Sequence, residues 1–335
     1  MKNTNLKICD AIIQPGETVN LALPLPDYNA CTSLFMPIKV VHGKEQGPCV
    51  LIFSGLEGNE FNGVKIINHL LKLNALNQLR GTLIAVPIMN ILGLINTLPN
   101  EKNLGDCFPG DVQGSYSERI AHIFTQEIFS KATHCIEIKT GALNADSLPQ
   151  IYCDLDNEEA KKLAKRFAAP VISHVNNNAN SFRKTAYDLN IPLLVYKAGE
   201  AMRFNEDAIK MGITGIENML DSLDMITLDE SLPDTFKPVF SLEQDWVRAH
   251  CSGILMTDVS LGQFVEKNQE IAQITDPFSA DTVEPVRCPQ DGIIVAINRN
   301  PLMSEGQNII KMASFIDNNR AELTLEQWNK IQQED

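Results

Sequence analysis

The stretch "CVLIFSGLEGNEFNGVKIINHLLKL" (residues 49–73) indicates the fold class, because an apolar run, a glycine-rich turn and a helical pattern follow one another in it. Further apolar runs of strand length recur at 82–88, 134–140, 171–175 and 192–198. Amphipathic helical patterns lie between them, at 117–132, 158–168 and 206–223. Apolar strands that alternate with helices predict an α/β class, with a mostly parallel mixed sheet and helices on both faces.

The character of the sequence changes after the polar stretch 228–238. Short β runs with regular glycines follow, and residues 252–274 and 291–312 share a weak internal repeat. Two such halves predict a small β-sandwich or barrel-sandwich-like domain. We therefore expect four units: an N-terminal β segment (1–40), an α/β domain (41–235), a β-sandwich domain (236–316) and a C-terminal helix (317–335) that docks through Trp328.

The charge balance argues against several classes of partner. The chain carries 28 Lys and Arg against 42 Asp and Glu, a formal charge of −14, whereas binding to nucleic acid or anionic membranes requires a basic surface. No apolar run approaches the roughly 18 residues of a membrane span. Eight cysteines without a CxxC pair, and the absence of a signal-peptide pattern, predict a cytoplasmic protein with reduced thiols.

Charged residues follow the ends of three predicted strands. Glu57 and Glu60 lie in the turn after the first strand, Lys139 lies at the end of 134–140, and Lys197 at the end of 192–198. Ligands of such sheets bind at the carboxyl ends of the strands. We therefore expect these side chains at one edge of the sheet, where they could hold a metal, a substrate or one another.

Two longer motifs resemble a known family. "CFPGDVQGSYSERIAH" (107–122) is similar to an FPGD-x-x-G-S-x-x-ER-x-AH stretch of the succinylglutamate desuccinylase/aspartoacylase family of zinc amidohydrolases, and residues 246–278 resemble the β domain appended to many of its bacterial members. The resemblance implies a zinc-carboxypeptidase-like fold. The β domain also resembles biotinyl and lipoyl carriers, but it has no lysine at a hairpin tip between its halves, which indicates a non-carrier module.

The zinc motifs depart from this family. Its G-x-H-G-N-E motif supplies a His and a Glu to zinc, whereas "GLEGNE" (55–60) has Glu57 in the His position and keeps Glu60. The family's third ligand, a His at a strand end, corresponds to Lys139 in "EIKTG" (137–141). A protonated lysine has no lone pair to offer a metal. The resemblance assigns the three zinc-ligand positions of the family to Glu57, Glu60 and Lys139. Only Glu60 has the residue type that the family motif has there.

The catalytic motifs depart as well. Lys197 in "VYKAGE" (195–200) occupies the position of the family's general-base Glu, and Glu200 follows three residues later. In "NLGDCFPG" (103–110), Gly105 and Asp106 stand where the family has an Asn–Arg pair, so the guanidinium clamp is absent. Asn103 is the first residue of this segment, and we expect it to line the pocket.

These substitutions compensate in charge. We expect Glu57 and Glu60 to face both Lys139 and Lys197, with Asp106 nearby, so that ammonium groups replace the metal as counter-charges. Carboxylates next to a lysine raise its pKa, which argues against either lysine acting as a base or forming a Schiff base.

We predict a family member without zinc-dependent hydrolase activity and without a cofactor. It keeps a charge-paired pocket for a small zwitterionic or anionic ligand, or binds a partner protein. The pocket residues are Asn103, Asp106, Lys139, Lys197, Glu57 and Glu60. The alternative is an active metal-dependent amidohydrolase of N-acyl amino acids, whose zinc site is rebuilt by Glu200 or by a histidine outside the motifs. The sequence leaves the ligand and self-association into a homo-oligomer open.

Overall fold

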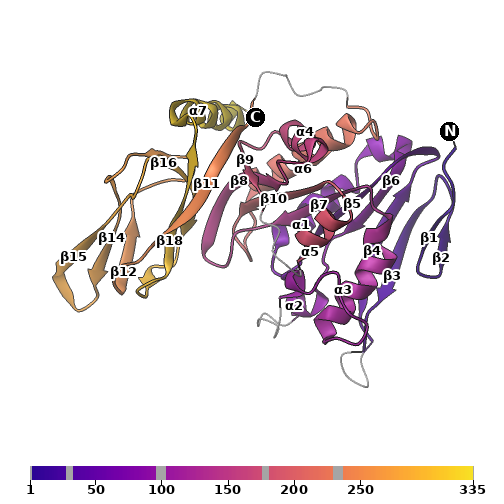
Figure 1. Ribbon diagram of the computed structural model, residues 1–335, viewed down its shortest axis with the longest axis horizontal. Helices are drawn as coiled ribbons and strands as arrows, with labels where there is room; N and C mark the ends of the chain where they lie inside the picture. Colours follow the sequence, from indigo (N-terminus) through magenta and orange to yellow (C-terminus); the bar gives the residue numbers. More distant parts are fainter. Residues whose placement is uncertain (1, 28–32, 96–102, 176–180, 229–236, 335) are drawn as a thin grey trace.

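The computed structural model describes residues 2–27, 33–95, 103–175, 181–228 and 237–334. The chain forms an elongated molecule, with a helix-covered sheet at one end and a β-rich half at the other (Figure 1). No helix in these ranges is long and apolar enough to cross a bilayer. The cysteines described in them are free thiols.

Twelve strands form one large sheet, in the order β13-β16-β18-β11-β9-β8-β10-β7-β5-β6-β4-β3. Its central strands β10 (Leu193–Gly199), β7 (His134–Lys139), β5 (Glu45–Ser54) and β6 (Arg80–Val86) are parallel neighbours. β8 (Ala145–Cys153) runs antiparallel to β10 and parallel to β9 (Val171–His174). The predicted α/β class is confirmed, and the parallel pairings lie in the middle of the sheet.

The N-terminal residues add β strands at one side. β1 (Leu6–Ile8) and β2 (Ala11–Ile13) form a hairpin of their own. β3 (Thr18–Pro24) forms the edge of the large sheet and pairs with β4 (Phe35–His42), which lies antiparallel to β6.

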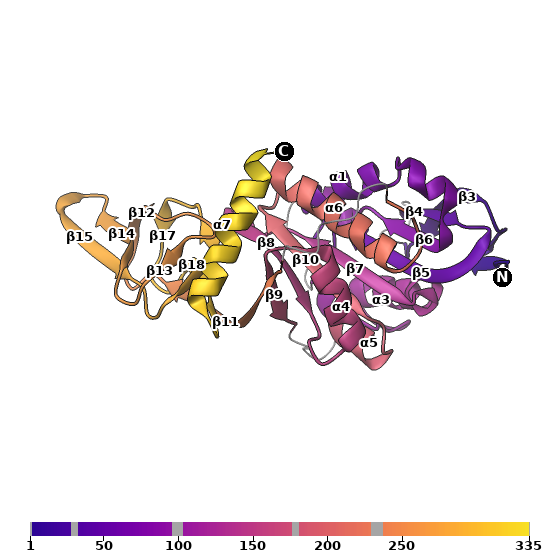
Figure 2. The same ribbon diagram turned by 90° about the horizontal axis from the view of Figure 1, so that it is seen from above.

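Helices cover both faces of the sheet (Figure 2). One face carries α1 (Phe61–Leu70), α4 (Glu158–Phe167) and α6 (Glu206–Ser222). The other carries α2 (Ile91–Ile95), α3 (Tyr116–Glu127) and α5 (Phe182–Asp188). Short 3-10 helices η1 (Asn74–Gln78), η2 (Leu104–Asp106) and η3 (Phe129–Lys131) join these elements.

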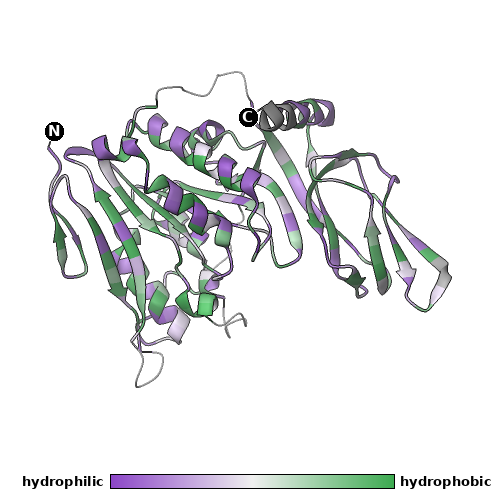
Figure 3. Cartoon of the chain, turned by 180° about the vertical axis from the view of Figure 1, so that it is seen from behind, coloured by the Kyte–Doolittle hydropathy of each residue, from purple (hydrophilic) through white to green (hydrophobic). Residues whose placement is uncertain are grey.

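The amphipathic pattern of α4 shows why these segments are helical. Its buried residues Ala160, Leu163, Ala164 and Phe167 recur at the spacing of one helical face, and the side chain of Asn157 caps its first turn. Figure 3 shows the same alternation across the molecule, with hydrophobic strands and hydrophilic outer faces of the helices.

The β-rich half consists of two sheets that share a core. The strands β12 (Gly253–Thr257), β14 (Glu270–Asp276), β15 (Ser279–Arg287) and β17 (Leu302–Met303) form a four-stranded sheet. It packs on β11 (Val239–Arg248), β13 (Phe264–Val265), β16 (Gly292–Asn298) and β18 (Asn308–Phe315) of the large sheet. Buried residues from both sheets, such as Ile274 and Ile310, form one apolar cluster.

The large sheet runs without interruption from the α/β part into the β-rich half. β11 lies beside β9 (Figure 1) and pairs with it in parallel through Val239–Val171. β16 pairs with β8 through Ala296–Ser147. The boundary predicted at residues 235 and 236 lies outside the described residues. The last element is the helix α7 (Asn318–Glu334), and its residue Trp328 is buried in the hydrophobic core of the α/β part.

Candidate functional site

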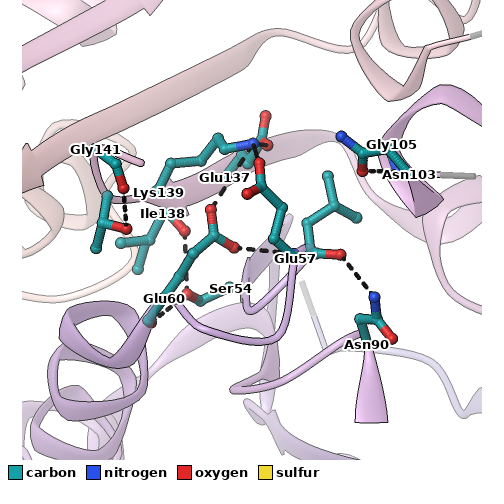
Figure 4. A network of polar contacts seen from close by, with 12 residues as sticks. Ser54, Glu57, Glu60, Asn90, Asn103, Gly105, Glu137, Ile138, Lys139 and Gly141 are labelled. Atoms are coloured by element: carbon teal, nitrogen blue, oxygen red, sulfur yellow. Dashed lines mark hydrogen bonds and ion pairs between the residues drawn. The ribbon is translucent and has the colours of Figure 1, made fainter. Parts of the chain in front are cut away.

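The "GLEGNE" turn is fixed between β5 and α1. Gly58 has a φ of 86°, and a Cβ atom there would collide with the backbone of Gly93, so this position requires glycine. The Ser54 hydroxyl lies 3.0 Å from the carbonyl oxygen of Ile138 on β7 and 3.3 Å from that of Glu60 (Figure 4). These contacts hold the two glutamates of the turn against the carboxyl end of β7.

Lys139 lies among three carboxylates. Its Nζ atom donates a hydrogen bond to Glu57 Oε1 at 3.1 Å, and lies 3.8 Å from Glu60 Oε1 and 3.7 Å from Glu137 Oε1 (Figure 4). Burial alone would lower the pKa of Lys139, but the carboxylates of Glu60, Glu137 and Glu57 outweigh it and raise the pKa above its ordinary value. Lys139 is therefore a permanently charged counter-ion for these groups.

Glu60 is the most deeply buried acid of this cluster, with only 1% of its side chain exposed. Burial raises its pKa from 4.5 to about 7; Lys139 opposes the shift, and Glu57 and Glu137 add to it. Its Oε1 atom accepts no hydrogen bond, while Oε2 accepts one from the backbone N–H of Glu57 at 3.4 Å. Burial therefore favours the protonated form of Glu60 at a higher pH than that of an exposed carboxyl.

Glu137 was not predicted as a site residue. It lies two residues before Lys139 on β7, so both side chains point to the same face of the sheet. Its Oε2 atom lies 3.6 Å from Nε of Arg183 on α5, which was also not predicted. The alternation in "EIK" (137–139) is a signal that could have identified Glu137, whereas nothing near Arg183 in the sequence marks it.

Lys197 lies beside Lys139, because the two residues pair in register on β10 and β7. It makes no ion pair with Glu57 or Glu60, so the expectation that both lysines face these glutamates is correct for Lys139 and wrong for Lys197. Glu137 lies on β7 with Lys139, and the turn after β5 that carries Glu57 and Glu60 lies on the side of β7 away from β10.

The surroundings of Lys197 are cationic. Burial lowers its pKa from 10.5 to about 8, and the charges of Lys311, Lys139 and Arg183 lower it further, against a weaker opposing effect of Glu57. The prediction that neighbouring carboxylates would raise the pKa of both lysines therefore fails at Lys197. Lys311 comes from β18 of the β-rich half, more than a hundred residues further along the chain.

A cavity of about 160 Å³ opens next to Lys139. Asn103, Asp106, Glu137, Lys139 and Arg183 are among its lining residues, so the structure brings the two predicted residues of the 103–110 segment to Lys139. Asn103 Oδ1 accepts a hydrogen bond from the backbone N–H of Gly105 at 3.0 Å, which closes this turn. A larger cavity of about 360 Å³ lies on the other side of Arg183, along α5.

The residues at this site do not fit a zinc ion as they are arranged. The Lys139 ammonium lies where Glu57, Glu60 and Glu137 converge, and its charge opposes that of a metal cation. Among the described residues, no group of three or more His, Cys, Asp or Glu side chains is placed to hold a metal. Glu200 is turned away, since its Oε1 atom accepts from the backbone N–H of Asn144 and from Arg203 Nε.

The fold and the placement of the charged residues define a class of protein: an α/β chain with a β-rich half, whose candidate site follows the ends of β5, β7 and β10. Residues 46–223 match the model of the succinylglutamate desuccinylase/aspartoacylase catalytic domain. The chain belongs to the succinylglutamate desuccinylase/aspartoacylase family.

Individual relatives resemble the chain over most of its length. It is 26% identical to an N-alpha-acetyl-L-2,4-diaminobutyric acid deacetylase of Halomonas elongata, over 89% of this chain and 91% of that protein. The fold resembles a succinylglutamate desuccinylase/aspartoacylase of Rhodobacter sphaeroides, with a TM-score of 0.81, 20% identity, and coverage of 93% of this chain and 100% of the other. It also resembles the product-bound ectoine utilization protein EutE (DoeB) of Ruegeria pomeroyi, with a TM-score of 0.81, 19% identity, and coverage of 94% and 100%.

Proposed function

We propose that this chain is a family member that does not hydrolyse substrates through zinc and instead binds a small zwitterionic or anionic ligand. The observation that carries the proposal is the position of Lys139 Nζ, 3.1–3.8 Å from carboxylate oxygens of Glu57, Glu60 and Glu137. An internal ammonium thus supplies the counter-charge that a metal would otherwise supply.

Electrostatics argue against a metal ion joining this cluster. A zinc ion near Glu57 and Glu60 would repel the Lys139 ammonium, and moving that ammonium would take it from the buried carboxylate of Glu137 as well. Removing one partner of a buried ion pair costs roughly 3–5 kcal/mol. Zinc binding would have to offset this cost with Glu60 as its one family-type ligand.

The general-base position supports the same proposal. In a zinc hydrolase of this kind a carboxylate would take a proton from the metal-bound water. Lys197 stands at that position, and with a pKa of about 8 it is mostly protonated at neutral pH. A protonated amine cannot accept that proton, but it can attract an anion.

The pocket beside Lys139 suits a small ligand with charges of both signs. Asp106 and Glu137 line it together with Lys139 and Arg183. Its volume of about 160 Å³ is smaller than the roughly 300–1,000 Å³ of pockets for drug-sized ligands. The name of the Halomonas elongata relative suggests the N-acetyl form of a diamino acid, which is zwitterionic at neutral pH, as the first ligand to test.

Metal content and hydrolysis test the proposal together. The protein is purified without a metal-affinity tag, its zinc is measured by mass spectrometry, and hydrolysis of N-acetyl and N-succinyl amino acids is assayed with and without a chelator. We expect far less than one zinc per chain and no chelator-sensitive hydrolysis. About one tightly bound zinc per chain, with activity lost on chelation, would refute the proposal.

A second candidate is an active metal-dependent amidohydrolase with a rearranged site. The observation that favours it is the similarity to a deacetylase across 89% of the chain. Hydrolysis of N-acetyl-2,4-diaminobutyrate in the presence of added Zn²⁺, Mn²⁺ or Co²⁺ would support it, if the Glu60→Ala variant lost that activity while remaining folded.

A further inference from the structure

Lys311 connects the β-rich half of the molecule to the candidate site. It lies on β18, opposite Trp246 of β11, and its Nζ atom is 5.8 Å from the ring centroid of Tyr152 on β8. Burial lowers the pKa of Lys311, and Asp245 opposes the shift. A partly buried lysine from the last strand, β18, thus reaches Tyr152 in the α/β part.

Lys197 and Tyr152 share this face of the sheet. Lys197 pairs in register with Gln150 on β8, and Tyr152 lies two residues further along the same strand. Side chains two residues apart on a strand point to the same face. Lys197 therefore lies beside Gln150 and Lys311 reaches Tyr152, on the same face of the sheet around β8. Lys311 is also the charge with the largest effect on Lys197.

Neutral polar groups that already satisfy one another form the floor of this region. Tyr152 Oη donates to Gln244 Oε1 at 2.8 Å, and Gln244 Nε2 lies 2.8 Å from both Gln150 Oε1 and Ser173 Oγ. Ser173 in turn is 2.7 Å from Ser241 Oγ. These residues come from β8, β9 and β11, so the floor joins both parts of the chain and adds no negative charge.

The two ammonium groups lack the counter-charge that Lys139 has. Within the described part of the chain, neither Lys197 nor Lys311 makes an ion pair with a carboxylate, and the paired carboxylates gather around Lys139 and Arg183. Like charges brought together in a desolvated place are unfavourable, and a bound anion offsets that cost. Lysine ammonium groups are common partners of carboxylate and phosphate oxygens.

We propose that Lys197 and Lys311 form a subsite for the carboxylate group of a small ligand, to which the α/β part and the β-rich half each contribute one lysine. A carboxylate group fits better than a phosphate group, because it brings one negative charge to the two lysines instead of up to two, and Glu57 and Glu137 near Lys139 repel the larger charge more strongly. The subsite adjoins the cavity beside Lys139, because Lys197 pairs with Lys139 in register. It deepens the proposed function, on which it rests for the view that this end of the sheet binds a ligand, by naming the group that the ligand presents.

Titration calorimetry with succinate, and separately with inorganic phosphate, tests the subsite on the full chain in a low-salt zwitterionic buffer. The variants are Lys197→Met, Lys311→Met and, as a matched control, Lys162→Met, which removes an exposed lysine from α4 on the opposite face. We expect succinate to bind the wild type and the control equally, and each of the other two variants to bind it at least about tenfold more weakly.

Each remaining outcome overturns part of the proposal. Unchanged succinate affinity in Lys311→Met would remove the β-rich half from the subsite, and tighter binding of phosphate than of succinate would refute the carboxylate assignment. No succinate binding to the wild type would refute the subsite.

A second measurement does not depend on the variants. Brief acetylation of the wild type, read by peptide mass spectrometry, should modify Lys197, and succinate should protect it. If succinate bound but left the acetylation of Lys197 unchanged, the subsite would lie elsewhere. Zinc content and hydrolysis are measured on the same preparation: a zinc-containing, active protein that bound succinate through both lysines would refute the proposed function and leave the subsite standing.

Discussion

Replacing Lys139 by methionine removes the ammonium that Glu57, Glu60 and Glu137 share, while keeping an unbranched side chain. Glu60 and Glu137 are only 1% and 2% exposed, so water cannot take the place of the ammonium without a change in the fold. At an effective dielectric constant of 20, unit charges 4 Å apart attract by roughly 4 kcal/mol, and desolvation of the partners offsets much of this. We expect the variant to lose about 3–5 kcal/mol of unfolding free energy at pH 8.

The loss should shrink in acid. Lys139 holds down the pKa of Glu60, which burial raises to about 7, so the variant raises this pKa further. A carboxyl whose pKa is higher in the folded than in the unfolded state takes up a proton on folding between the two values. The penalty is therefore present above the folded pKa and fades as the pH falls towards the unfolded value. At pH 5 the difference between variant and wild type should be clearly smaller than at pH 8.

Chemical unfolding followed by circular dichroism at pH 8 and pH 5 measures both effects. The control variant Lys162→Met replaces an exposed lysine of α4 and should stay within about 0.5 kcal/mol of the wild type at both values. A loss below about 1 kcal/mol at pH 8 would show that Lys139 does not neutralise the buried carboxylates. A loss of equal size at both pH values would refute the role assigned to Glu60.

Two further predictions concern the same strand ends. The pKa of Lys197 is lowered from 10.5 to about 8, so the unfolded chain binds this proton more tightly than the folded chain does. Below pH 8 the charged lysine therefore lowers the free energy of unfolding, by at most about 3 kcal/mol. Lys197→Met should therefore be about 1–3 kcal/mol more stable than the wild type at pH 7, and this advantage should fade as the pH rises from 8 towards 10.5; equal stability at pH 7 would contradict it. The triple variant Glu57→His, Lys139→His and Lys197→Glu should bind about one Zn²⁺ per chain by calorimetry, because it places two His and one Glu side chain, the ligand set that the motif resemblance implies, at the ends of β5 and β7; a folded triple variant without zinc affinity would show that the backbone of the site has changed too.

The predictable part of the fold was encoded in local patterns. The apolar runs at 49–55, 82–88 and 134–140 correspond to β5, β6 and β7 within a few residues. β8 was not predicted, because "ADSLPQIYC" (145–153) contains a proline and several polar residues, and its burial comes from strands on both sides. α5 was missed because its seven residues are too short to show an apolar period.

The residues of the candidate site also fall into those that local sequence patterns predict and those that only the tertiary fold brings in. Glu57, Glu60 and Lys139 could be placed together because each lies in or beside a strand-end motif of the family. Arg183 and Lys311 could not, since a short helix and a strand of the β-rich half bring them in. The continuity of β9 with β11 is what brings Lys311 near Lys197, and a strand pairing of this kind leaves no signal in the local sequence.

The two lysines of the site show why residue type and charge balance are not enough to assign a role. Lys139 and Lys197 are register partners on adjacent strands, yet the pKa of one is raised and that of the other is lowered. The carboxylates come from β7 and the turn after β5, so they surround the lysine on β7 and leave the next strand without a counter-charge. Lys139 thus neutralises its neighbours, whereas Lys197 adds a positive charge that no carboxylate of the described chain pairs with. That unpaired charge is the reason to place the carboxylate group of the ligand at Lys197, next to the cavity beside Lys139.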